Sequence, residues 1–211
     1  MKTWLRLLAW VGGVLGVVAA VLYFAVFDVW TIPSDDPMEA ASIEPNVSSG
    51  DVVLLSKHTT VARGSLLRCA DPQAPGRWVV ARAVAMGNER IDLKDEAVML
   101  DGHRQPSPRA CDQARYVLLD PQSNEDVEMR CSIEEFGERE FGVLAAMQHP
   151  EPPTVATVEA GRWYLVSDDR HIHVDSRDFG TVDPATCEHI VFRLQSAKGF
   201  GDSKTRLTII W

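Results

Sequence analysis

The sequence predicts a mostly β protein, in which one N-terminal transmembrane helix precedes a β domain that carries a small inserted β subdomain. Three observations predict this fold class. Residues 7–27 are an uncharged apolar run, short stretches rich in valine, isoleucine and aromatic residues recur from residue 51 onward, and the composition turns proline-rich and polar between residues 103 and 160. Glycine, asparagine and proline separate the short stretches, as they do between strands.

Residues 7–27 are the expected anchor, after a short cytoplasmic N-terminus of residues 1–6. Because an α-helix rises about 1.5 Å per residue, the run spans roughly 30 Å, the thickness of the hydrocarbon core of a bilayer. Lys2 and Arg6 precede the run and Asp28 follows it, so the positive-inside rule places the rest of the chain on the outer, periplasmic side of the cytoplasmic (inner) membrane. A cleaved signal peptide has a shorter apolar core, about 7–15 residues, followed by small residues, so the bulky end of this run favours a retained single-pass anchor.

Residues 31–102 and 161–211 are expected to form the β domain, and residues 103–160 the inserted accessory subdomain. No convincing helical periodicity follows the anchor. The acidic run 134–140 is expected to be a solvated surface, because like charges repel and favour water. The expected strands are "DVVLLS" from 51, "RWVVARAVA" from 77, "RIDL" from 90, "AVML" from 97, "RYVLL" from 115, "DVEMRCSI" from 126, "RWYLVS" from 162, "HIVFRLQ" from 189 and "RLTIIW" from 206.

All four cysteines, Cys69, Cys111, Cys131 and Cys187, lie in the exported part, where an oxidising compartment permits disulfides. Three pairings are open, and Cys111 with Cys131 is favoured because the two flank a strand-rich stretch. No CxxC motif occurs, which argues against a zinc ribbon, and neither a metal nor a cofactor is expected. Residues 31–211 carry 19 basic and 29 acidic residues, a net charge of −10, which argues against a nucleic-acid partner.

Three stretches, in this order, resemble bacterial type I signal peptidases, which are membrane-anchored serine endopeptidases. In residues 31–57, "SIEP" followed by "SSGD" and a strand is similar to the family's Ile-Pro-Ser-Gly-Ser-Met-x-Pro segment and its Gly-Asp, with Ser42 at the position of the nucleophile. Residues 76–93 look like the family's strand that ends Lys-Arg-Val-Ile-Gly. The most specific match is "DDRHIHVDSRDFGTV" (168–182), similar to Asp-Asn-Arg-x-x-Ser-x-Asp-Ser-Arg-x-Phe-Gly-x-Val.

The resemblance implies a domain of coiled antiparallel β-sheets behind a single anchor, and a Ser/Lys mechanism at the membrane surface. In that mechanism a neutral lysine takes the serine proton, while a hydroxyl and a backbone N–H stabilise the oxyanion. An unassisted serine hydroxyl is a poor nucleophile at neutral pH, so acyl transfer needs all of these groups.

The sequence departs from this pattern at three supporting positions. The lysine falls at Ala81, which can accept no proton, and the neighbouring Arg82 stays protonated and cannot act as a base. The serine that the family uses at the oxyanion is Ala40, and the hydroxyl that steadies the lysine falls at His173. The supporting positions that keep the family's residues are Arg82, Asp168, Asp175, Ser176 and Arg177.

His171, His173 and Asp175 alternate in "HIHVD", so an extended backbone would point all three side chains the same way. Histidine can act as a base near neutral pH, and two imidazoles with a carboxylate suit zinc. A relocated histidine base and a metal site therefore stay open beside a plain surface loop.

The sequence thus predicts a membrane-anchored, signal-peptidase-like protein whose activity is impaired or lost, and which meets exported preproteins or an active signal peptidase. One alternative is an active, rewired peptidase with Ser42 as nucleophile and a histidine as base. The other is a metal-binding anchored domain.

Overall fold

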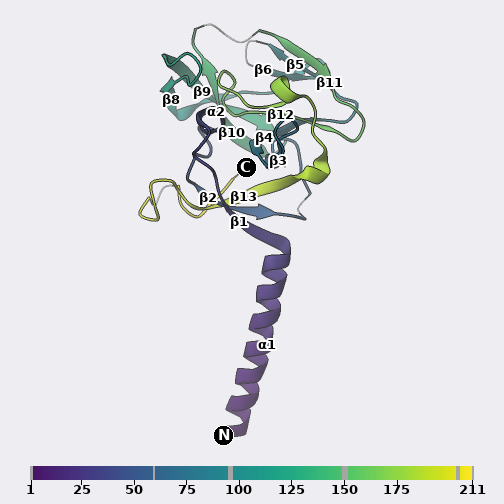
Figure 1. Ribbon diagram of the computed structural model, residues 1–211, viewed down its shortest axis with the longest axis vertical. Coiled ribbons are helices and arrows are strands. Elements are labelled where there is room, and N and C mark those ends of the chain that lie inside the picture. Colours follow the sequence, from purple (N-terminus) through teal and green to yellow (C-terminus); the bar gives the residue numbers. More distant parts are fainter. Residues whose placement is uncertain (1, 59, 95–96, 149–151, 203–204, 211) are drawn as a thin grey trace.

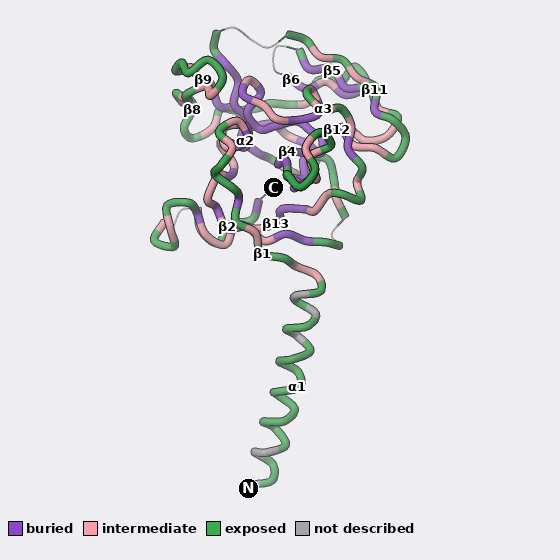
Figure 2. The backbone as a smooth tube through the Cα atoms, in the orientation of Figure 1, coloured by how far each residue is buried: buried purple, intermediate pink, exposed green. Residues whose placement is uncertain are grey.

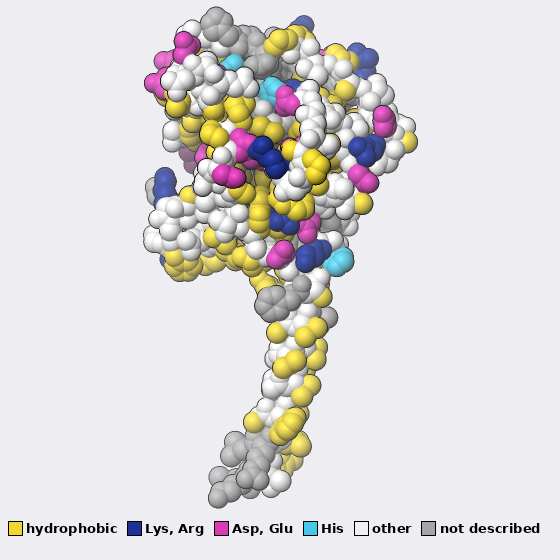
Figure 3. All heavy atoms as spheres, in the orientation of Figure 1, with side chains coloured by type: hydrophobic (Ala, Val, Ile, Leu, Met, Phe, Trp, Pro, Cys, Tyr) yellow, Lys and Arg dark blue, Asp and Glu magenta, His cyan; other side chains and the backbone are white. Residues whose placement is uncertain are grey.

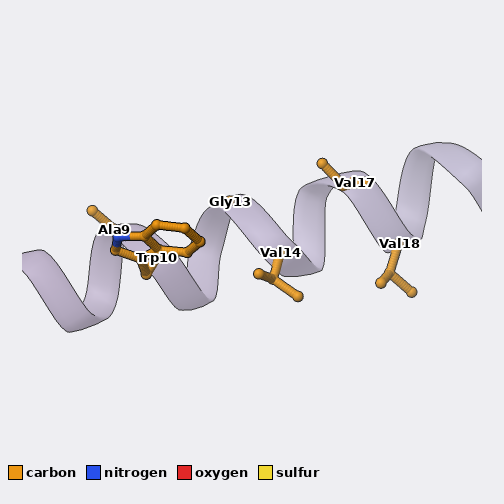
Figure 4. A pocket seen from close by; sticks show the side chains of 6 residues that line it. All are labelled: Ala9, Trp10, Gly13, Val14, Val17 and Val18. Carbon is orange, nitrogen blue, oxygen red and sulfur yellow. The ribbon is translucent and has the colours of Figure 1, made fainter.

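The computed structural model describes residues 1–211 except residues 1, 59, 95–96, 149–151, 203–204 and 211. The described chain is mostly β, with antiparallel sheets and few helices, as the sequence predicts. The N-terminal helix α1 (Lys2–Val26) projects from the β domain, and its described side chains are exposed as far as Ala25, whereas buried residues concentrate in the β domain (Figures 1 and 2). One face of α1 carries Ala9, Trp10, Gly13, Val14, Val17 and Val18 (Figure 4).

Among the described residues, no helix is both long enough and apolar enough to cross a membrane.

Seven of the described strands form the main sheet, in the order β1-β2-β13-β3-β4-β12, with β14 beside β13. Every neighbouring pair is antiparallel. Helix α1 runs directly into β1, so the helix joins the sheet at one edge (Figure 1). The strands are β1 (Phe27–Thr31), β2 (Val52–Ser56), β3 (Leu66–Ala70), β4 (Trp78–Met86), β12 (Trp163–Val166), β13 (Cys187–Gln195) and β14 (Thr208–Ile209).

Two smaller sheets pack beside the main one, in the orders β10-β9-β8 and β11-β5-β6-β7. The second of them takes two strands from before residue 103 and two from the region 103–160, so this accessory region is continuous with the β domain. The strands are β5 (Arg90–Lys94), β6 (Ala97–Leu100), β7 (His103–Arg104), β8 (Arg109–Leu119), β9 (Asp126–Phe136), β10 (Arg139–Ala146) and β11 (Thr154–Thr157).

The acidic run 134–140 is not simply a solvated surface, and that expectation is wrong for Glu134. The run contains the turn between β9 and β10, with Gly137 at φ 64°, a conformation that favours glycine. Strand alternation turns Glu134 inward, where it is 3% exposed and forms an ion pair with the fully buried Arg170. Burial raises the pKa of the Glu134 carboxyl, against the opposing pull of Arg170.

The predicted pairing of Cys111 with Cys131 is confirmed, and Cys69 pairs with Cys187. The first bond joins β8 to β9, and the second joins β3 to β13. Gly142 on β10 packs against the first bond, because a Cβ there would lie 3.4 Å and 3.5 Å from the two sulfur atoms and 3.0 Å from Pro45. This close approach holds the sheet β10-β9-β8, here called the accessory sheet, against the loop that follows Ser42.

Candidate functional site

Ser42 is the last residue of a short helix, α2 (Pro37–Ser42). Asp36 caps the helix by accepting from the N–H groups of Met38 and Glu39, and Pro37 occupies the first turn, where its missing N–H costs nothing. The Ser42 side chain is fully buried, and its Oγ donates to the Glu39 carbonyl, 2.9 Å away. The hydroxyl therefore bonds within its own helix.

Ala81 lies in the middle of β4, the strand beside α2, and is fully buried. Its methyl group packs in an apolar cluster with Leu67, Cys69, Val79 and Leu165. Ala40, two residues before Ser42, contributes no hydroxyl. The position of the lysine and that of the oxyanion serine thus offer neither a proton acceptor nor a hydrogen-bond donor in their side chains.

Arg82, the residue after Ala81, forms a fully buried ion pair with Asp168. The contact is bidentate, with Nε 2.6 Å from Oδ1 and Nη2 3.1 Å from Oδ2. Arg82 also donates to the Gly64 carbonyl and lies 3.7 Å from the centre of the Phe141 ring. A buried charge is tolerated when it is paired and hydrogen-bonded, and this pair meets both conditions.

Asn46 ties the Asp168 carboxylate to the accessory sheet. Its Nδ2 donates to Asp168 at 2.7 Å and to the Gly142 carbonyl at 2.6 Å, while its Oδ1 accepts from the Gly142 N–H. Asn46 is four residues after Ser42, so the loop that follows Ser42 is fixed to Gly142 on β10 and, through Asp168, to Arg82 on β4.

Asp175, Ser176 and Arg177 build a second polar cluster around the short helix α3 (Ser176–Phe179). Asp175 caps this helix, accepts from the Ser167 N–H and pairs with Arg177, while the Ser176 Oγ accepts from the Leu165 N–H. Burial works to raise the pKa of the Asp175 carboxyl, but the Arg177 charge and hydrogen bonds outweigh it and lower that pKa. All three side chains are occupied in fixing the backbone beside β12.

The backbone bends at residues 171, 172 and 175, so the segment 171–175 is not the extended strand that the alternation in "HIHVD" suggests. The His173 ring lies 2.9 Å from Asp178 and 4.0 Å from Asp175. His171 lines a cavity of about 270 Å³ together with His173 and Asp178. The hydrogen bonds of Ser42 in the described chain go to Glu39 and Asp169, so neither histidine is bonded to its hydroxyl.

A different trio from the expected one has the donor atoms for a metal ion. His173, Asp175 and Asp178 each place one ligand atom within 4.8 Å of the others. However, the Asp175 carboxylate is already bound by Arg177, and Asp178 accepts from both His173 and the Asp175 N–H. These contacts account for the cluster as a cap of α3.

The comparisons with known proteins identify this arrangement. A family model described as signal peptidase, peptidase S26, matches residues 5–192. The chain belongs to the signal peptidase family. The matched residues include Ser42, Ala81 and the whole segment from Asp168 to Arg177, and the resemblance seen in the sequence is thereby confirmed. Among curated proteins, no match is found.

Membership of the signal peptidase family links this geometry to a function. Signal peptidases act on exported preproteins, so a signal-peptidase-like function is supported for this chain. The ion pairs of Arg82 and Asp175 lie where the resemblance predicts supporting residues, whereas the position of the lysine, Ala81, offers no base to Ser42.

Glu39 is a residue of this site that the sequence reasoning missed. It lies one helical turn before Ser42, is 7% exposed, and accepts from the Val80 N–H at 2.6 Å. Burial raises the pKa of its carboxyl to about 8, with smaller contributions from the charges of Asp71 and Asp175. The signal was present, because Asp36 followed by Pro37 is a helix start that places residues three apart on one face.

Proposed function

We propose that this protein is a membrane-anchored member of the signal peptidase family that holds extended segments of exported preproteins and cleaves them slowly or not at all. The observation that carries the proposal is the pair Ser42 and Ala81. The hydroxyl bonds to its own helix, and a methyl group stands at the position that the resemblance assigns to the lysine.

The size of the expected loss supports this proposal. Removing the base of a serine triad costs on the order of 10⁶-fold in rate, and removing an oxyanion donor costs ~10²–10³-fold. Such losses are not additive, but the first alone removes useful turnover. The buried pairs of Arg82 and Asp175 need no reaction to explain them, since they hold the backbone around β4 and β12.

The anchor is part of the proposal. Residues 7–27 are uncharged, and α1 covers 25 residues, roughly 37 Å at the helical rise. Hydrophobic side chains run along the coloured part of α1, whereas acidic and basic side chains lie over the β domain (Figure 3). In this arrangement the β domain meets preproteins, or an active signal peptidase, at the outer face of the cytoplasmic membrane.

Protease added to spheroplasts tests the placement. We expect digestion of residues 31–211, with α1 retained in the membrane fraction and the N-terminus intact. Full protection of the chain, or a mature N-terminus near residue 28, would contradict the anchored placement.

The loss of activity is tested by restoring the missing groups. The purified full chain in detergent is incubated with a preprotein that has small residues at its cleavage site. Ala81→Lys alone should give at most slight cleavage, Ala40→Ser with Ala81→Lys should give more, and His173→Ser should improve the double variant further. These groups act on one transition state, and burial is what lets a lysine at position 81 lose its charge.

Adding Ser42→Ala to the restored triple variant is the matched control and should abolish the gained cleavage. Chemical crosslinking should show the uncleaved preprotein bound to the wild-type chain. Absence of any crosslinked preprotein would contradict the holding role.

A further inference from the structure

A polar cavity of about 200 Å³ lies between the two smaller sheets, and neither Ser42 nor Ala81 lines it. Its polar lining comes from β7 with the residues that follow it, which provide Arg104, Gln105 and Ser107, and from β9, which provides Arg130, Ser132 and Glu134. Because side chains alternate along a strand, the three from β9 share one face. A space of this size is well above what one water molecule needs, so it has room for a small polyatomic ligand.

Hydrogen bonds fix the backbone that carries Arg104 against β9. The Gln105 N–H donates to the Val98 carbonyl at 2.8 Å, and the Pro106 carbonyl accepts from the Glu135 N–H at 2.9 Å. The first bond holds the end of β7 to its own sheet, and the second ties the following segment to the accessory sheet. The two sides of the cavity therefore keep a fixed separation.

The two arginines of the cavity differ from those elsewhere in the β domain. Arg68 and Arg177, for example, are paired with carboxylates. Within the described residues, by contrast, the guanidinium groups of Arg104 and Arg130 form neither an ion pair nor a hydrogen bond. Glu128 lies two residues before Arg130 on the same face of β9, but no ion pair joins them.

A third arginine without an ion pair in the described chain, Arg115, adds positive charge beside the cavity. It lies on β8 directly opposite Arg130 in the register of the accessory sheet. Like charges directly opposite each other destabilise a pair of strands. An anion bound at Arg130 would offset this repulsion.

Glu134 does not cancel the positive charge, because it is already paired. Its carboxylate accepts from the fully buried Arg170, whose Nη1 also donates to the Ser167 carbonyl at 2.7 Å. Three positive side chains, Arg104, Arg130 and Arg170, therefore stand against one carboxylate, an excess of two positive charges. The chain as a whole has a net charge of −9, so the cavity is a local exception to its acidic character.

We propose that this cavity binds the phosphate group of a soluble molecule. Guanidinium groups bind phosphate oxygens through paired N–H donors, and two of them match the charge of about −1.5 to −2 that a phosphate monoester carries. The hydroxyls of Ser107 and Ser132 line the same space and can donate to the remaining oxygens. The site is separate from the proposed holding of preproteins and does not depend on it.

The place of the cavity in the fold favours a soluble ligand over a lipid of the membrane that α1 is proposed to enter. The strands β6 and β9 lie at the end of the β domain away from α1 (Figure 1). Lipid headgroups around α1 are therefore at the opposite end of the domain from Arg104 and Arg130.

The test titrates inorganic phosphate into the full chain in detergent micelles at pH 7.5 and low ionic strength, by isothermal titration calorimetry. We expect one site with a dissociation constant of about 1 mM or tighter. Arg104→Gln and Arg130→Gln should each weaken binding at least tenfold, because each removes a charge-assisted contact. Arg130→Lys keeps the charge but loses the paired donors, so its affinity should lie between those of wild type and Arg130→Gln.

Arg90→Gln is the matched control, because Arg90 is an exposed arginine on β5 that does not line the cavity. It should bind phosphate as wild type does. Glycerol phosphate should compete for the site, whereas phosphatidic acid in the micelles should not. Displacement of phosphate by phosphatidic acid would overturn the soluble source, and equal affinities of wild type and Arg130→Gln would overturn the site.

Urea unfolding gives a second readout that separates binding from a structural role of Arg130. Without phosphate, Arg130→Gln should unfold at the same urea concentration as wild type or a higher one, because the repulsion from Arg115 is relieved. Phosphate, compared with chloride at equal ionic strength, should raise the midpoint of wild type but not that of Arg130→Gln. A variant already destabilised without phosphate, or a wild-type chain that binds none, would overturn the proposal.

Discussion

Two sets of residues around β4 differ in chemistry. The first, here called the frame, is the buried ion pairs of Arg82 and Arg177. The second, the reaction positions, is Ser42, Ala40 and Ala81. In the frame, Arg82 pairs with Asp168 and Arg177 pairs with Asp175, with all four side chains buried or nearly so. At the reaction positions, the Ser42 hydroxyl bonds only within its helix, and alanines stand at the positions of the lysine and of the oxyanion serine, Ala81 and Ala40. A buried charge must be paired for the chain to fold at all, whereas a base and an oxyanion donor matter only to the reaction. The buried ion pairs can therefore be kept for stability although the groups needed for catalysis are absent from the reaction positions.

The largest expected effect comes from breaking the frame. Arg82→Met should lower the free energy of unfolding by about 3–5 kcal/mol, because Asp168 is left as an unpaired buried charge. The control is Arg109→Met, which removes an exposed pair with Glu140 and should cost under ~1 kcal/mol. Urea unfolding of both variants measures the difference, and similar small losses would show that the frame is not what holds the domain.

The accessory sheet offers the next largest effect. Replacing Cys111 and Cys131 together by serine opens a loop of 20 residues and should cost roughly 3 kcal/mol on the chain-entropy model. Because Gly142 packs on this bond and holds Asn46, the variant should also loosen the Ser42 loop. Limited proteolysis locates the loosened segment. Cleavage confined to β8 would show that the disulfide stabilises the accessory sheet without affecting the loop that follows Ser42.

Acid should lower the stability of the β domain through His189 on β13. His189 is paired with Leu67 on β3, which is in turn paired with Ala81 on β4. Burial lowers the pKa of its imidazole to about 4, helped by the charges of Arg139 and Arg82. The unfolded chain then binds a proton that the folded one refuses, so stability is present above about pH 6.5 and is lost as the pH falls toward 4.

His189→Leu tests this contribution by unfolding between pH 7 and pH 4. Wild type should lose roughly 2–3 kcal/mol more than the variant over this range. The exposed His58→Leu is the control and should follow wild type. Identical pH profiles for wild type and His189→Leu would contradict the role of the buried imidazole.

Much of the fold could be predicted from sequence, where short runs are rich in valine, isoleucine and aromatic residues, as in β2, β4 and β13. The sequence does not predict β1, β3, β7, β10 or β11. Strand β3, Leu66–Ala70, carries no valine, isoleucine or aromatic residue, and β10 begins in the acidic run that suggested solvent. The helix α2 was missed although Asp36 and Pro37 mark its beginning.

The candidate site divides in the same way. The resemblance to the motifs of the signal peptidase family locates Ser42, Ala81, Arg82 and Arg177. No motif assigns a role to Glu39, because its partner is the backbone N–H of Val80, 41 residues away. That N–H is available to a side chain only because β12 does not extend along this part of β4. The alternation in "HIHVD" assumes an extended backbone, but the chain bends within residues 171–175 and His173 lies beside Asp178 instead.

The smallest expected effect is that of Ser42→Ala on stability. The substitution removes a hydroxyl whose hydrogen bond stays within α2, so the free energy of unfolding should change by about 1 kcal/mol or less. A loss several times larger would mean that Ser42 belongs to the frame and not to the reaction positions.

The most direct test of the account compares cleavage of a preprotein by the wild-type chain and by Ser42→Ala. Both are purified at full length and incubated with the same preprotein at pH 7 and pH 8.5. Because Ala81 cannot take the serine proton and Ala40 cannot donate to an oxyanion, we expect little or no turnover by wild type and no difference between the two proteins. Efficient wild-type cleavage that Ser42→Ala abolishes would contradict the account, and substitution of His171, His173 or Glu39 would then identify the base.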